Sequence, residues 1–253
     1  MNFLVVRHYF KRAFTDITSL LLLVGLPMGI IIIGSLGEHE LVNGYDVGAT
    51  FMTMWMLLSF QFFTGAVMIY FLYQDFKGDM RWRLNATPHT QRTFFISATI
   101  ANWIFAVAVG VLIIIISNLF LNVYLGNILI LGLVLLLFSL MTALLSLIIF
   151  LFIKKVGTAN GFIYTISFGI LVLGNFMTTS ESPVVNFLGN YSNPIPVGLR
   201  AIFYSGAMRD AIPFFDSGGM RESVLNIAIL LIVVCILAII AFIGLRRRID
   251  DNF

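Results

Sequence analysis

The stretch from Tyr73 to Arg92 reads YQDFKGDMRWRLNATPHTQR and separates two long apolar runs of the chain. Its charged residues are Asp75, Lys77, Asp79, Arg81, Arg83 and Arg92. So many charges are too costly to place in the hydrocarbon of a bilayer, whereas the flanking runs are apolar enough to enter it. The stretch is therefore expected to lie in water between two membrane-spanning helices.

The apolar residues of this stretch recur at helical spacing. They are Tyr73, Phe76, Met80 and Leu84. The pattern predicts a short amphipathic helix over residues 74–87, and Thr87 and Pro88 suit the N-cap and the first turn of the next helix. A segment that only reversed the chain could be much shorter, so the apolar stripe indicates contact with another surface. The alternative is a solvated loop whose side chains lie against lipid headgroups.

The composition places the chain among integral membrane proteins. Its 253 residues are 60% hydrophobic and 11% charged, with a mean hydropathy of +1.01, whereas roughly a quarter of the residues of a soluble domain are charged. The net charge is +3, but the basic residues stand in short clusters beside apolar runs, where they orient membrane helices. Nucleic acid is therefore not expected as a partner.

Apolar runs of span length predict six transmembrane helices, which form a single all-α membrane domain over residues 1–253. The runs cover about 17–36, 49–72, 94–121, 128–153, 160–178 and 224–245. Fifteen residues of the chain are Lys or Arg, and twelve of them fall on one side of these spans. The twelve are Arg7, Lys11, Arg12, Lys77, Arg81, Arg83, Arg92, Lys154, Lys155, Arg246, Arg247 and Arg248. The positive-inside rule places that side, with both termini, in the cytoplasm of a cell membrane.

Residues 1–16, which precede the first span, have a basic and amphipathic pattern. One helical face would carry Phe3, Val6, Phe10, Ala13 and Phe14, and the other face His8 and Arg12. This pattern predicts an elbow helix that lies in the membrane interface and leads into the first span. A simple basic flank that fixes orientation is the alternative.

The segment of residues 179–223 lies outside, between the fifth and sixth spans. It contains apolar pieces that are each too short to cross a bilayer, such as those around Val184, Ile195 and Phe214. Irregular backbone at membrane depth is tolerated where protein or a water-filled cavity surrounds it. The segment is therefore expected to form short extracellular or re-entrant helices, with a loose loop as the alternative.

Catalytic residues and metal sites are not expected. No Asp, Glu, Lys, Arg or His falls in the central part of a predicted span, where a proton- or ion-driven carrier usually needs one. His8, His39 and His89 lie outside the spans and far apart in sequence. There is no GxxxxGK[ST] phosphate loop with which the chain could bind ATP. The sequence thus predicts no cofactor on this chain, and the energy for any transport would come from a partner.

Two groups of side chains within the spans are candidates for a substrate path. The aromatic-rich second span contributes Trp55 and Phe62, and one face of the fourth span carries Ser139, Thr142 and Ser146. Aromatic and hydroxyl groups together would suit a hydrophobic or amphipathic molecule. Packing against a neighbouring helix is the alternative for both groups.

The arrangement as a whole resembles the type-2 permeases of ABC exporters. The residues that carry the resemblance are Asp75, Gly78, Leu84, Thr87 and Pro88. At these positions members of that family tend to have an acidic residue, a glycine, a leucine and a threonine-proline pair. The family usually has Glu where this chain has Asp75 or Asp79.

The resemblance implies that residues 74–87 are a coupling helix, which docks on an ATPase subunit. The residues it assigns to coupling are Asp75, Phe76, Gly78, Asp79, Met80, Arg81, Arg83 and Leu84. The complex would hold two permease chains, identical or homologous, and two ATPase subunits that bind ATP and Mg. Its substrate would be an antibiotic, a peptide or a lipid-like molecule. A second hypothesis is a membrane sensor or assembly scaffold that binds a cytoplasmic partner through residues 74–92 and transports nothing.

Overall fold

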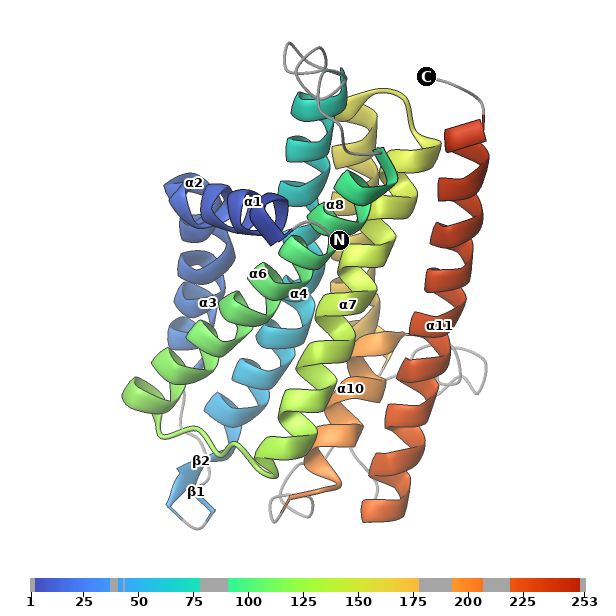
Figure 1. Cartoon of the computed structure of the whole chain (residues 1–253). Coiled ribbons are helices and arrows are strands. Elements are labelled where there is room, and N and C mark those ends of the chain that lie inside the picture. The colour runs from blue at the N-terminus through green and yellow to red at the C-terminus, as the bar shows by residue number, and fades with distance from the viewer. Residues whose placement is uncertain are drawn as a thin grey trace.

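The computed structural model describes residues 3–36, 41–42, 44–77, 91–177, 193–206 and 219–250. The helices are α1 (Phe3–Thr15), α2 (Ile17–Leu20), the π-helical η1 (Leu21–Gly25), α3 (Leu26–Gly34), α4 (Val47–Lys77), α6 (Gln91–Leu121), α7 (Ile128–Phe152), α8 (Val156–Met177), α10 (Pro194–Phe203) and α11 (Met220–Asp250). Strands β1 (Leu41–Val42) and β2 (Tyr45–Asp46) pair in a small antiparallel hairpin. The described fold is therefore a helical bundle (Figure 1).

Five of the described helices are long and apolar enough to cross a membrane. They are Ile17–Gly34, Val47–Phe76, Arg92–Leu121, Ile128–Phe152 and Met220–Arg247. The all-α, multi-pass membrane class is thus confirmed, and these five helices coincide with predicted spans. The remaining predicted span falls on α8, whose described apolar part, Val156–Val172, is shorter than the other five.

Helix α4 forms the centre of the bundle. In an 18-residue window of its candidate span 83% of the residues are buried, against 22% in the corresponding windows of the first and last candidate spans. It packs against α3, α6, α7 and α8. The outward side chains of α11 are apolar, and Ile239 and Phe242 are more than half exposed. A helix that is apolar on all sides and exposed on one is suited to face lipid.

The first span contains a π-helical turn. The backbone N–H of Leu26 bonds to the carbonyl of Leu21, five residues earlier. Pro27 follows, and a proline within a helix has no N–H to donate and crowds the carbonyl four residues before it. The wider π turn is one way a helix accommodates such a residue. The sequence Gly25-Leu26-Pro27 therefore alters the helix without ending it.

Helix α10 is short and almost wholly enclosed. Ile195, Leu199 and Ala201 are each at most 1% exposed, and the helix packs against α4, α7, α8 and α11. It begins at Asn193, whose side chain accepts a hydrogen bond from the N–H of Ile195 and donates one to the carbonyl of Ile170 in α8 at 2.8 Å. Short extracellular or re-entrant helices were expected within residues 179–223, and α10 is a short helix in this segment. The rest of that segment up to α11 falls mostly outside the described residues.

The bundle has two ends, between which α1 lies crosswise (Figure 1). The connection from α7 to α8 and the C-terminal end of α11 are at one end, and the β1–β2 hairpin and the connection from α6 to α7 are at the other. Several exposed cations of the described residues belong to the segments at the end where α7 connects to α8. They are Arg92, Lys154, Lys155, Arg246 and Arg247.

Candidate functional site

The last turn of α4 is joined to α1 by a polar contact, which we call the α1–α4 contact and which consists of Arg12, Phe71, Gln74 and Asp75. Nη1 of Arg12 donates to Oδ1 of Asp75 at 2.9 Å, and Nη2 donates to Oε1 of Gln74. The guanidinium carbon lies 4.3 Å from the centroid of the Phe71 ring. One cation thus bonds a carboxylate and an amide while it packs on an aromatic face.

Local structure explains the position of Arg12. Val6, Tyr9 and Ala13 recur along one face of α1 and are buried, because α1 packs across α6. Arg12 lies next to this face, with its side chain 27% exposed. Asp75 stands in the last turn of α4, where the helix dipole disfavours a carboxylate. The positive charge of Arg12 offsets that penalty. The sequence pattern placed Arg12 with His8 on the face of α1 opposite the apolar one, and this is wrong, because the Arg12 side chain bonds to Asp75 of α4.

Tyr9 adds a buried hydroxyl beside the α1–α4 contact. Its ring is 6% exposed, and burial, followed by the negative charge of Asp75, raises the pKa of its hydroxyl above the ordinary range. Within the part of the chain described, this hydroxyl has no hydrogen-bond partner of normal geometry. Tyr9 therefore stays neutral at any physiological pH and contributes a polar group without a charge.

Two residues of the predicted apolar stripe are inside the bundle. Phe76 is 7% exposed, and its ring stacks on Phe95 at a centroid distance of 4.4 Å. The Tyr73 ring meets Phe150 edge to face at 5.0 Å, and its hydroxyl donates to the carbonyl of Ile153. Both residues belong to α4, which runs without interruption to Lys77. The prediction that Phe76 lies on a docking surface is wrong, because α6 and α7 already cover its ring.

The remaining residues expected to couple to an ATPase lie outside the described residues. They are Gly78, Asp79, Met80, Arg81, Arg83 and Leu84. The predicted helix over residues 74–87 thus has its first four residues in α4, and Asp75 among them is held by Arg12. The α1–α4 contact therefore ends where this charged segment begins.

A row of polar side chains runs through the core between α4 and α7. Oγ of Ser139 donates to Oε1 of Gln61 at 3.0 Å, and both side chains are fully buried. Ser146 bonds to the carbonyl of Thr142 on its own helix. A Cβ atom added to Gly65 would overlap Oγ of Ser146, so the two helices approach closely at this glycine. Sequence reasoning missed Gln61, although it is an amide in the middle of a long apolar run.

The residues predicted to line a substrate path are packed in the core. Ser139, Thr142 and Ser146 are 0% exposed, while Phe62 and Trp55 are 1% and 6% exposed. Phe62 meets Phe138 of α7 edge to face at 5.9 Å. Helix packing, the alternative reading of the hydroxyl row, is what the structure shows for these side chains.

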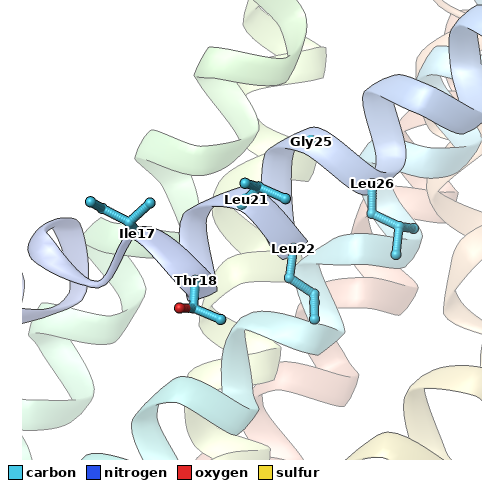
Figure 2. Close-up of a pocket in the computed structure, with 6 residues that line it drawn as sticks. All are labelled: Ile17, Thr18, Leu21, Leu22, Gly25 and Leu26. Atoms are coloured by element: carbon cyan, nitrogen blue, oxygen red, sulfur yellow. The ribbon is translucent and has the colours of Figure 1, made fainter.

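An apolar groove of about 520 Å³ follows the outer side of the first span. Figure 2 shows its lining, which is formed by Ile17, Thr18, Leu21, Leu22, Gly25 and Leu26. The hydroxyl of Thr18 is the only polar side-chain group among them. Such a lining suits hydrocarbon and carries no group that could do acid-base chemistry or hold a metal.

The polar side chains of the described residues mainly connect helices to one another. These residues contain no group of three or more His, Cys, Asp or Glu side chains that could hold a metal ion. The Asp, Glu, Lys and Arg residues of the described spans stand near the helix ends, as Asp75, Arg92 and Glu222 do. What the arrangement can do is hold helices in register and transmit force between them.

The ion pair between Arg12 and Asp75 can be tested by a double-mutant cycle. Arg12→Gln leaves a nearly buried carboxylate without its cation and should lower the free energy of unfolding by about 1–3 kcal/mol. Asp75→Asn should lower the free energy of unfolding by less. The loss in the double variant should be smaller than the sum of the losses in the two single variants. Arg7→Gln, on the exposed face of α1, is the matched control. Additive losses in detergent-solubilised unfolding would show that the pair contributes nothing.

No protein-family model matches the chain, and the search of the curated proteins found no match. A function is therefore inferred from the residues and their geometry.

Proposed function

We propose that this chain is the membrane-spanning permease subunit of an ATP-driven exporter, of the type-2 permease kind. The observation that carries the proposal is the α1–α4 contact. It ties a helix that lies across the bundle to the last turn of the most buried span, directly before the charged segment 78–92. A partner that pushed on this segment would move α4 and α1 together.

The distribution of charge supports an external energy source. The described spans carry their Asp, Glu, Lys and Arg side chains near their ends, so a chain of carboxylates or other charged proton carriers across the membrane is not available from them. A carrier driven by protons or ions usually needs such groups at membrane depth. Export by this chain would instead draw on ATP hydrolysis by two partner ATPase subunits, with Mg and ATP bound there.

The docking role is assigned to the charged segment beyond α4. Met80 and Leu84 are the apolar candidates, and Asp79, Arg81 and Arg83 are candidates for charged contacts that set the register of the complex. Phe76 and Tyr73 are not part of this surface, since both are buried in the bundle. Asp75 acts indirectly, through Arg12.

The substrate proposed is a hydrophobic or amphipathic molecule, such as an antibiotic, a peptide or a lipid-like compound. The core between α4 and α7 is lined by aromatic rings, hydroxyls and one amide, without charge. Because these groups are enclosed within one chain here, the path would form where two permease chains meet or when the helices move apart. Both termini would lie in the cytoplasm, on the side where the exposed cations cluster.

The proposal predicts that ATP turnover depends on a second protein. Purified alone, the chain should hydrolyse no ATP. When mixed with the cognate ATPase in liposomes it should form an assembly of two permeases and two ATPases and stimulate turnover. Met80→Ala/Leu84→Ala should weaken this docking by roughly tenfold or more, because two apolar side chains lose their cover. Phe120→Ala/Leu119→Ala, at exposed positions of α6, is the matched control.

The alternative, a sensor or scaffold that binds a partner through residues 74–92, makes a different prediction. The partner would then bind but no substrate would accumulate inside inverted vesicles on addition of ATP. Transport driven by a proton gradient, with no ATPase present, would contradict both hypotheses.

A further inference from the structure

Helix α1 presents a fixed outer face. Its inner face is held by the buried residues Val6, Tyr9 and Ala13 and by the pairing of Arg12 with Asp75. The rotation of α1 about its own axis is therefore determined. This orientation decides which residues of the helix are exposed. They are Phe3, Leu4, Arg7, His8, Lys11 and Thr15.

This outer face is cationic with an apolar end. Phe3 and Leu4 are 70% and 71% exposed, and Arg7 and Lys11 follow them at four-residue spacing along the same side. Helix α1 contains no Asp or Glu. Among the residues that the structure describes, neither Arg7 nor Lys11 forms an ion pair.

The acidic groups nearest in the chain are already occupied. Asp16, which follows α1, accepts a hydrogen bond from the backbone N–H of Ser19 and another from its hydroxyl. Asp75, across the helix, bonds to Arg12. Among the described residues no carboxylate pairs with Arg7 or Lys11, so their positive charge is available to a ligand.

We propose that the outer face of α1 binds anionic phospholipid, with Arg7 and Lys11 at the headgroup phosphate and Phe3 and Leu4 in the acyl-chain boundary. The chemistry is complementary in both parts, since two cations meet an anionic headgroup and two apolar side chains meet hydrocarbon. A soluble phosphate would use only the cations. The exposed apolar pair therefore favours a lipid. This inference does not depend on the proposed transport function.

The experiment compares lipid preference in two variants of equal charge. Arg7→Gln/Lys11→Gln removes the two cations of α1, and the control Arg200→Gln/Arg221→Gln removes two cations from the side of the spans opposite the predicted cytoplasmic side. Each protein is purified in detergent and mixed with phosphatidylglycerol and phosphatidylcholine, and bound lipid is counted by native mass spectrometry. Wild type should prefer phosphatidylglycerol. The preference of the α1 variant for phosphatidylglycerol should fall roughly thirtyfold, since each cation near an anionic surface contributes about fivefold, and the control variant should keep most of its preference.

Further measurements distinguish lipid binding from binding of free phosphate, and loss of binding from loss of the folded structure. Phe3→Ser/Leu4→Ser should also lower the retention of phosphatidylglycerol, and inorganic phosphate alone should not compete with the lipid. Helix content measured by circular dichroism should be unchanged in all variants, because Arg12 and the buried face of α1 are untouched. Equal loss in the α1 and control variants, or full displacement by inorganic phosphate, would overturn the proposal.

Discussion

Replacing Phe76 by Ala should destabilise the helical bundle by about 3 kcal/mol, which is within the range measured for large-to-small substitutions in protein cores. Its ring lies in a cluster of aromatic side chains from α6 and α7. The centroid distances are 4.4 Å to Phe95, 6.1 Å to Phe150 and 6.5 Å to Phe94. Ala at this position would leave a cavity, and the three remaining rings would lose their packing partner.

The measurement is thermal unfolding of the purified protein in detergent, in which we expect a loss of roughly 5–10 °C. Phe120→Ala is the control, because it removes the same ring from a position that is 75% exposed. The destabilisation should appear without any ATPase present. If Phe76→Ala kept full stability and lost only permease-dependent ATP turnover, Phe76 would belong to a docking surface after all, and the buried position of its ring would be contradicted.

Replacing Gly198 by Ala should force α10 away from its neighbours. A Cβ atom at this position would lie 2.7 Å from Cε2 of Phe138 and 2.8 Å from Cδ1 of Leu58. The aromatic ring cannot bend out of the way, so overpacking should cost about 1–3 kcal/mol. This loss exceeds the gain of nearly 1 kcal/mol that Ala normally brings to a helix interior.

A control substitution at a second glycine separates the cost of overpacking from the gain in helix propensity. Gly161 lies in α8, and a Cβ atom added there would meet nothing within 4 Å. Gly161→Ala should therefore leave thermal stability unchanged or raise it slightly. In Gly198→Ala, hydrogen exchange of the α10 amides should rise more than that of α7, and adding Phe138→Leu should restore part of the protection. Equal behaviour of the two glycine variants would refute the close contact at α10.

These two substitutions would also bear on the proposed function in different ways. Phe76 and the α1–α4 contact lie where α4 ends and the charged segment begins, so changes there should alter how movement reaches the bundle. Gly198 lies in a short helix that touches four others. Variants of Gly198 should therefore change transport more than partner docking.

The glycine contacts show that the spacing of glycines in the sequence does not predict where helices pack closely. The spacing of Gly157 and Gly161 is one that often allows helices to approach, yet neither glycine has a neighbour within 4 Å of an added Cβ atom. The close approaches occur at Gly65, Gly110 and Gly198. No short motif marks these three residues, because their partners come from other helices.

The sequence by itself determined the class of the protein and the position of most spans. Both follow from hydrophobicity summed over about twenty residues, a local property that needs no knowledge of neighbours. The same reasoning predicted a short apolar helix before the last span, which is α10. It also predicted the amphipathic character of α1.

Only the tertiary structure decided which neighbour each helical face meets. The pattern of Tyr73 and Phe76 predicted a shared face, but the rings of α6 and α7 made that face part of the core. Arg12 and Asp75 are 63 residues apart, and their pairing depends on how α1 crosses the bundle. Helical periodicity groups side chains on one side of a helix, whereas the burial of that side depends on the surfaces that long-range packing brings against it.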